Sequence, residues 1–236
     1  MILISAGMPK SGSTLLANYQ EDLLKASGRA SAQALLAQRY TPAFRPWTAA
    51  RLARLGRQGD MVLKTHSPLN LPLRSLIHLG LARATFSHRD PRDVLLSAID
   101  HGERTRRGED PSGAFAGFRS VESGLPLLRG TLVQAERWFR HPGVLLIGYA
   151  DLINEPETIL RRVADLMEWR VSDGQIRESV DRQAAAREST PNFNKGTLGR
   201  HESEMSEAER HLCDVAMARF LSLKPIAGEP RASTRS

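Results

Sequence analysis

Cysteine, aromatic residues and long apolar runs are all scarce in this chain of 236 residues. The single cysteine, Cys213, cannot form a disulfide within the chain, so a disulfide-stapled fold is excluded and a reducing, cytoplasmic compartment is expected. Cys213 lies in a helical pattern, which favours a buried structural thiol. No run approaches the roughly 20 apolar residues of a membrane-spanning helix. Met1 leads directly into a strand-like run without a basic leader, so we expect no secretory signal and no membrane partner.

Lysine is also scarce, although the chain is basic. The formal net charge is +7, and only five of the 33 basic residues are lysine: Lys10, Lys25, Lys64, Lys195 and Lys224. A basic balance suits an anionic ligand, which can be a nucleotide, a nucleic acid or a membrane surface. Most arginines are scattered along helical patterns, as at Arg51, Arg54 and Arg57, which indicates solvated helix faces. Aromatic residues make up 6% of the chain and do not alternate with basic ones, so we expect no nucleic-acid partner.

Short apolar strands alternate with helices along the chain, which predicts an α/β fold: a three-layer sandwich with a central parallel sheet. We expect one domain over residues 1–223 and a disordered tail over 224–236. Residues 101–124 are polar and glycine-rich and are interpreted as a loop. The expected strands are 2–4, 61–63, 84–87 and 143–147, and the expected helices are 15–26, two within 30–57, 71–79, 91–100, 127–139, 156–169, 175–187 and 206–223.

Four basic side chains directly follow these strands: Lys10, Lys64, His66 and Arg89. The carboxyl ends of parallel strands meet at one edge of a sheet, where ligands of open α/β sheets bind. We therefore expect these residues to gather at one ligand site.

The first strand is followed by a glycine-rich turn, Gly7 to Thr14, that precedes a helix. Two glycines five residues apart and a Ser-Thr pair give the spacing of a phosphate-binding loop, whose backbone amides surround an anion. An ATPase or GTPase needs lysine directly after the second glycine. Ser13 occupies that position here, and the lysine lies inside the loop instead, at Lys10.

The run Pro9-Lys10-Ser11-Gly12-Ser13-Thr14-Leu15 resembles the 5'-phosphosulfate loop of sulfotransferases that use 3'-phosphoadenosine 5'-phosphosulfate (PAPS). The displaced lysine is the specific feature of the match. The resemblance implies that Lys10 stabilises the leaving phosphate and the sulfuryl oxygens. It also implies that the loop amides and hydroxyls, from Ser11, Gly12, Ser13 and Thr14, bind the 5'-phosphate. Leu15 replaces a tryptophan that many members have near the adenine, so the residue that stacks on adenine is left open.

A second match, Arg89-Asp90-Pro91-Arg92-Asp93-Val94-Leu95-Leu96-Ser97, resembles the family's 3'-phosphate motif. It implies that Arg89 and Ser97 bind the 3'-phosphate. From the residues themselves, Asp90 is a helix N-cap and Pro91 the first helical residue. We interpret Arg92, Asp93 and His88 as structural.

Two weaker matches complete the expected nucleotide site. Residues 194–200 resemble in part the loop that closes over the nucleotide, which implies 3'-phosphate contacts from Lys195 and Gly196 and a weaker one from Arg200. Asn194 replaces the usual arginine, and Arg200-His201 replaces Asp-Trp. Tyr149 follows the last expected strand as in the family, where it lies near the nucleotide, although a core tyrosine is equally compatible with the sequence.

Lys64-Thr65-His66 resembles the segment that carries the general base of cytosolic sulfotransferases. It implies that His66 is the base and that Lys64 orients the sulfuryl group. A histidine can accept a proton near neutral pH. His101 is the alternative base, although a structural role at its helix end is equally compatible. PAPS is then the donor, 3'-phosphoadenosine 5'-phosphate (PAP) the product, and no metal is expected.

The function predicted is transfer of a sulfuryl group from PAPS to a hydroxyl or amine of a small-molecule or carbohydrate acceptor. A P-loop small-molecule kinase is one alternative, but it needs lysine at position 13 and a carboxylate for magnesium. A basic polyanion- or nucleic-acid-binding protein is the alternative from another class, and a catalytically inactive relative is a third. The acceptor is expected to contact residues 35–55 and 100–135, and a homodimer is left open.

Overall fold

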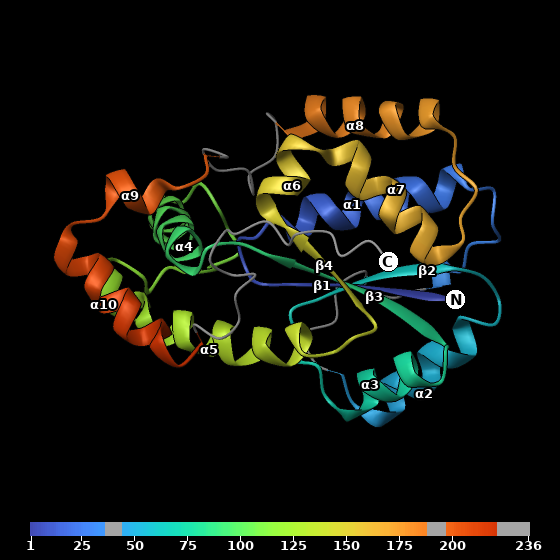
Figure 1. The fold of residues 1–236 in the computed structure, drawn as a ribbon, viewed down its shortest axis with the longest axis horizontal. Helices are drawn as coiled ribbons and strands as arrows, with labels where there is room; N and C mark the ends of the chain where they lie inside the picture. Colours follow the sequence, from blue (N-terminus) through green and yellow to red (C-terminus); the bar gives the residue numbers. More distant parts are fainter. Residues whose placement is uncertain (36–43, 188–196, 221–236) are drawn as a thin grey trace, which may run out of the picture. The chain divides into compact units, whose positions relative to one another are not determined.

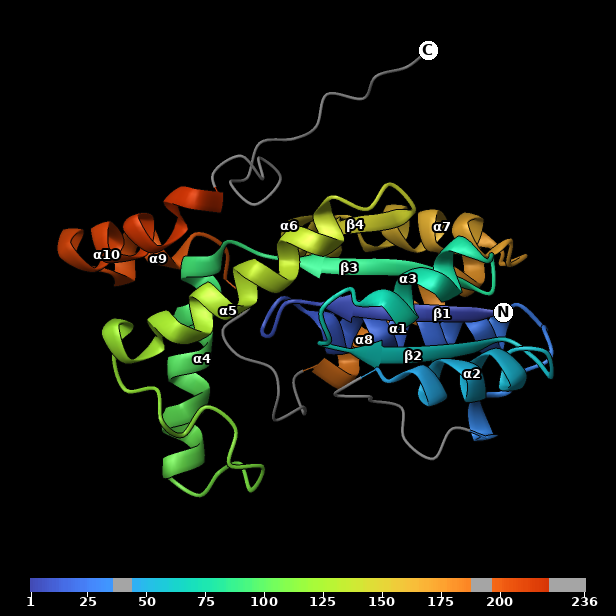
Figure 2. The ribbon, with the colours of Figure 1, turned by 90° about the horizontal axis from the view of Figure 1, so that it is seen from below.

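The computed structural model describes residues 1–35, 44–187 and 197–220 of the chain. Within these ranges four parallel strands form one sheet in the order β2-β1-β3-β4 (Figures 1 and 2). Their bounds are β1 Ile2–Gly7, β2 Met61–Thr65, β3 Ala82–His88 and β4 Val144–Gly148. All four predicted strands are confirmed, and so is the α/β class with a central parallel sheet.

The helices of the described residues follow the predicted alternation with some differences. Their bounds are α1 Ser13–Ala26, η1 Gln33–Leu35, α2 Pro46–Leu55, α3 Leu71–His78, α4 Pro91–Arg106, α5 Val121–Phe139, α6 Tyr149–Asn154, α7 Pro156–Met167, α8 Asp173–Arg187, α9 Arg200–Glu204, α10 Glu207–Met217 and η2 Ala218–Phe220. The loop predicted over 101–124 is wrong at both ends, because α4 continues to Arg106 and α5 begins at Val121. Helices α6 and α9 were not predicted, since each is too short to show helical periodicity. The tail over 224–236 lies outside the described residues.

The chain forms two compact units. The first comprises residues 1–88 and 137–190 and contains the sheet; the second comprises residues 89–136 and 191–236. In the first unit, α1 and α7 cover one face of the sheet with α8 packed on them, and α2 and α3 lie on the other face (Figure 1). The second unit contains α4, α9, α10 and most of α5.

Parallel strands buried on both faces explain the apolar composition of β1. All six of its residues are buried. Leu3 contributes to the core beneath α1 and α7, together with Leu16, Leu160 and Val163. Side chains of a strand alternate between its two faces, so Ser5 and Gly7 lie on the same face as Leu3. That face of β1 therefore points toward α1, the helix that begins at the end of the glycine-rich turn.

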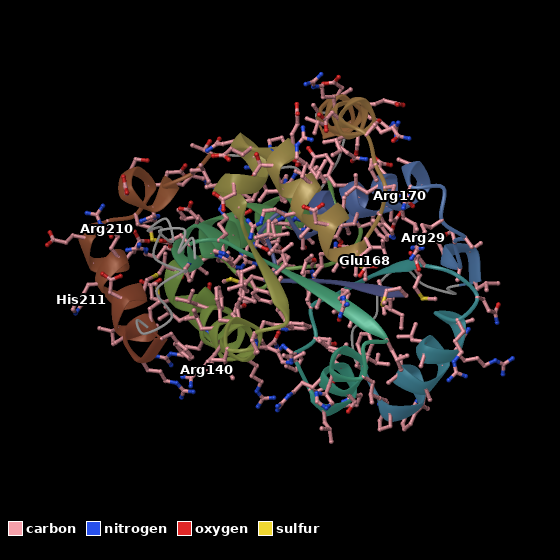
Figure 3. The ribbon with its side chains drawn as sticks, turned by 45° about the vertical axis from the view of Figure 1, so that its right-hand side comes forward. Arg29, Arg140, Glu168, Arg170, Arg210 and His211 are labelled. Carbon is pink, nitrogen blue, oxygen red and sulfur yellow. The ribbon has the colours of Figure 1, made fainter. Side chains whose placement is uncertain are left out.

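Many of the arginines are surface residues, as their scattered positions predicted, although Arg89 and Arg200 are buried. Arg51, Arg54 and Arg57 are exposed on or directly after α2. Figure 3 labels further examples, among them Arg29 and Arg170, whose side chains are also exposed. The basic composition therefore reflects solvated surfaces over much of the chain and does not itself locate a ligand site.

Candidate active site

The turn between β1 and α1 adopts backbone conformations that suit an anion-binding loop. Lys10 has φ 60° and Gly12 has φ 79°, so both residues are in the left-handed region. That region is uncommon for a side chain such as lysine, and such strain is concentrated at functional sites. Gly12 is also the N-cap of α1. The loop thus turns sharply into the helix at the position where the sequence places its second glycine.

Ser11 fastens this loop to the neighbouring strand β3. Its side chain is fully buried, and Ser11 Oγ lies 2.7 Å from Met8 O, 3.0 Å from Ser87 O and 2.8 Å from Ser87 Oγ. The backbone amide of Met8 also donates to Ser87 O, at 2.9 Å. The hydroxyl of Ser11 therefore stabilises the conformation of the loop by joining it to β3. The expectation that Ser11 binds phosphate stays a prediction, and the backbone amide of Ser11 is the group that these contacts do not involve.

Two glycines allow the loop to pack this closely. A Cβ at Gly7 would lie 2.0 Å from Ser87 Oγ, and a Cβ at Gly12 would lie 2.9 Å from Cδ2 of Tyr149. Tyr149 is buried at the start of α6, so its ring supports the loop where the loop enters α1. The structure thus places Tyr149 beside the loop with its ring packed against the backbone, and its contact with the nucleotide stays a prediction.

The start of α1 is suited to bind a negative charge. Among the described residues, no side chain caps this helix and no acidic residue lies in its first turn. The first amides of a helix have no partner within the helix and carry partial positive charge, so they bind phosphate groups well. Lys64 adds a full positive charge nearby, since its Nζ donates to Thr14 Oγ1 at 2.6 Å. Two residues from distant parts of the sequence, both expected at the site, are therefore in direct contact.

His66 is fastened to the same loop. Its Nδ1 lies 2.7 Å from the carbonyl oxygen of Gly7, the last residue of β1. A carbonyl oxygen only accepts hydrogen bonds, so Nδ1 carries the proton and a neutral ring has its lone pair on Nε2. Burial lowers the pKa of His66, the hydrogen bond to Gly7 raises it, and the charge of Lys64 lowers it further; the net shift is downward. The ring is therefore neutral at pH 7 and can act as a base through Nε2.

A tryptophan that the sequence did not indicate supports the segment after His66. Trp138 is buried near the end of α5, and its Nε1 donates to Ser67 O at 3.1 Å. Its ring stacks on that of Phe86 in β3, with 5.6 Å between ring centroids. Trp138 therefore restrains the backbone next to His66. A tryptophan in a helix looks like an ordinary core residue, so the sequence carries no signal for this role.

The second unit contains the other expected anion-binding group, around Arg89. This arginine is buried, and its Nη2 donates to Thr197 O at 2.6 Å and lies 3.4 Å from Asp93 Oδ2. Ser97 is buried on α4, one turn beyond Asp93. Asp90 caps α4, since Asp90 Oδ1 accepts from the amide of Arg92 at 2.8 Å, and Pro91 is the first helical residue. The predicted cap is confirmed.

Asp93, which the sequence analysis treated as an ordinary structural residue, is the centre of this group. Its Oδ2 accepts from the amide of Gly199 at 3.0 Å and from Arg89. Its Oδ1 accepts from the amide of His201 at 3.1 Å and lies 2.9 Å from His201 Nδ1. The hydrogen bonds from His201 and the charge of Arg89 lower the pKa of Asp93 against the opposing effect of burial. The available signal was its place one turn before Ser97, on the same helix face.

Three further candidates are buried: Arg200, His101 and Cys213. Arg200 is almost fully buried, and its guanidinium forms ion pairs with Asp100 at 2.8 Å and Glu204 at 2.6 Å, which favours a structural role. His101, the alternative base, is buried with Nε2 2.5 Å from Asp110 Oδ2, which favours its structural role. Cys213 is buried and burial raises its pKa to about 11, which confirms an unreactive thiol.

The remaining site candidates are only partly described. Lys195 and Gly196 lie outside the described residues. Leu15 is half-buried on α1 and packs against the core of the first unit. Ser13 is buried at the first position of α1.

A search over the described residues found no group of three or more histidine, cysteine, aspartate or glutamate residues that could hold a metal ion. Over the same residues, no helix is both long and apolar enough to cross a membrane.

The fold and the loop define an α/β protein of the class that binds a phosphate group at the first strand–helix junction. The family model described as "Sulfotransferase domain" matches residues 2–219, so this chain belongs to the sulfotransferase domain family. The resemblance seen in the sequence is confirmed, and with it the sulfotransferase class. No curated protein sequence matches the chain significantly.

Solved structures of the same fold contain bound PAP. Mouse sulfotransferase SULT7A1 complexed with PAP matches with a TM-score of 0.67 and 16% identity, over 96% of this chain and 89% of that chain. Retinol dehydratase matches in its complex with androsterone and PAP, with a TM-score of 0.59 and 16% identity over 100% of this chain and 82% of that one. The complex of retinol dehydratase with retinol and PAP matches with a TM-score of 0.60 and 16% identity, over 100% of this chain and 83% of that chain. At this identity the likeness concerns the fold.

Proposed function

We propose that this protein transfers the sulfuryl group of PAPS to a hydroxyl or amine of a small-molecule or carbohydrate acceptor and releases PAP. Two hydrogen bonds carry the proposal: Lys64 to Thr14 and His66 to Gly7. They hold Lys64, near the end of β2, against the start of α1, and His66, directly after β2, against the end of β1. A base, a cation and an anion-binding helix start are thereby combined within the first unit.

The chemistry assigns each group a task. The acceptor oxygen or nitrogen attacks sulfur, and its proton passes to His66 Nε2 as the new bond to sulfur forms. The bond between sulfur and the bridging phosphate oxygen breaks, and its electron pair leaves with PAP. The leaving phosphate needs positive charge and does not need a proton. Lys10, Lys64 and the amides of α1 supply this positive charge as fixed electrostatic stabilisation. The loop amides from Ser11 to Thr14 hold the 5'-phosphate.

The second unit supplies the groups for the 3'-phosphate. Arg89 presents a buried guanidinium, which forms paired hydrogen bonds with phosphate oxygens, and Ser97 presents a hydroxyl from α4. Tyr149 and Leu15 are proposed at the nucleotide from the family resemblance, as are Lys195 and Gly196. We further propose that residues 1–223 act as one domain, which the span of the family model over both units supports. A cytoplasmic location is supported by the single unreactive thiol.

An acceptor screen with labelled PAPS tests this function. Wild-type protein is expected to bind PAP and to transfer label to at least one hydroxyl or amine acceptor among phenols, sugars and secondary metabolites. His66→Ala is expected to bind PAP normally and lose turnover, because only the base is removed. Lys10→Ala is expected to lose both, because the charge that holds the phosphate is removed. A wild-type protein that binds ATP with magnesium and not PAP would establish the kinase alternative, and full activity of His66→Ala would refute the base.

A further inference from the structure

The segment from Thr197 to His201 is fastened to α4 at two points two helical turns apart. Asp93 and Asp100 are seven residues apart, so they lie on the same face of α4. Asp93 accepts from Gly199 and His201, and Asp100 pairs with Arg200. Three consecutive residues of the segment, 199–201, thus contact two acidic residues of α4: Gly199 and His201 contact Asp93, and Arg200 contacts Asp100. Arg200 and His201 are also among the positions at which this chain departs from the family pattern.

The same carboxylate reaches Arg89. Its Oδ2 is shared between the amide of Gly199 and the guanidinium of Arg89, and Arg89 Nη2 also donates to Thr197 O. Arginine has a long side chain with many rotamers, and fixing it costs conformational entropy. If the side chain is already fixed in the folded protein, binding of a phosphate does not include this entropy cost, because the guanidinium is already oriented.

We propose that Asp93 is a positioning residue for the nucleotide: its carboxylate fastens residues 199–201 to α4 and orients Arg89 toward the 3'-phosphate. This inference rests on the proposed function, because it assigns Arg89 to that phosphate. It makes Asp93 responsible for the preference of the protein for a nucleotide with a 3'-phosphate over the same nucleotide without one. His201, through Nδ1, is the side chain that completes the arrangement.

Calorimetric titration with PAP and with 5'-AMP separates this role from a general effect on folding. Asp93→Asn keeps the size of the side chain but places an NH₂ group against one pair of donors, either Gly199 and Arg89 or the two of His201. We expect its affinity for PAP to fall at least about tenfold, the loss of a hydrogen bond to a charged group. Its affinity for 5'-AMP should stay within twofold of wild type. Glu103→Gln, on the exposed side of α4, is the matched control and should change neither.

A second position keeps the test decisive if Asp93→Asn does not fold. His201→Leu removes only the Nδ1 contact and leaves the other three donors, so we expect a loss in PAP affinity of about threefold to tenfold. His201→Asn offers an amide donor close to the position of Nδ1 and should restore the affinity. In steady-state kinetics both losses should raise KM for PAPS while kcat stays within about twofold, because the groups at sulfur are untouched.

The outcomes of this experiment distinguish two failures. If wild-type protein binds PAP no better than 5'-AMP, the proposed function itself is wrong. If wild-type protein prefers PAP and both Asp93→Asn and His201→Leu keep the full preference, the assignment of Asp93 is overturned and the proposed function stands. An equal loss of affinity for PAP and for 5'-AMP would also overturn the assignment of Asp93, because such a loss would show that Asp93 has a purely structural role.

Discussion

At the scale of single residues, His66 shows how surroundings suit an ordinary side chain to the role of base that we propose for it. An unperturbed histidine has a pKa of about 6.5 and is partly charged near neutral pH. Burial disfavours the imidazolium ion, and the charge of Lys64 disfavours it further, so the pKa of His66 is lowered even though Gly7 accepts a hydrogen bond from the ring. The carbonyl also selects the tautomer with Nε2 unprotonated.

The pH dependence of turnover tests this assignment. The base must be unprotonated, and its pKa lies below 6.5, so kcat/KM for the acceptor should fall only below about pH 6.5 and be level at pH 7. His141, whose pKa is also lowered by burial and by Arg74, provides the control. His141→Asn should keep both the rate and the acidic limb of the profile. A profile whose acidic limb lies above pH 7, or disappears in His141→Asn, would contradict the assignment.

At the scale of elements, the junction of β1 and α1 depends on close backbone packing. Gly12 has a positive φ and lies against the ring of Tyr149, while Ser11 is bonded to β3. The loop amides can therefore face an anion only while α6 supports the loop from one side and β3 from another. The glycine at position 12 is required for two separate reasons, conformation and space.

Gly12→Ala is expected to abolish PAP binding and activity. The left-handed backbone costs a non-glycine residue roughly 1–2 kcal/mol, and displacing Tyr149 adds about 1–3 kcal/mol of overpacking. Gly28→Ala is the matched control, because Gly28 also has positive φ (66°) but nothing lies within 4 Å of its Cβ position. In chemical denaturation, Gly28→Ala should lose only the free energy of unfolding that the left-handed backbone costs, and its activity should be normal. Equal losses in the two variants would show that the Tyr149 contact is unimportant.

At the scale of the whole molecule, the nucleotide should stabilise the folded chain. The residues that we propose at the nucleotide must be folded to bind it. A ligand at 100 times its dissociation constant stabilises the folded state by about 2.7 kcal/mol.

For a chain of this size we expect PAP to raise the midpoint of thermal unfolding by about 5–10 °C. The shift should be the same with and without EDTA, since the charges assigned to the leaving phosphate are lysine and backbone amides. ATP with magnesium should give no comparable shift. A shift that needs a divalent cation would favour the kinase alternative.

The sequence by itself determined the fold class and the four strands, and its motifs point to the residues that we propose as the phosphate loop, the base and the Arg89 group. Those features are local: apolar runs, glycine positions and short motifs at strand ends carry them. The boundaries of α4 and α5 and the short helices α6 and α9 were missed, because marginal helices are stabilised by packing that a local pattern does not contain.

Only the tertiary structure decided what individual polar side chains do. Ser11 belongs to a phosphate motif, yet its hydroxyl is used by β3; Asp93 resembles an ordinary helical acid, yet it joins two segments more than a hundred residues apart. Trp138 donates to the carbonyl oxygen of Ser67, which lies 71 residues earlier in the chain. A hydrogen bond depends on distance and direction between two specific groups. When those groups are distant in sequence, only the folded chain brings them together.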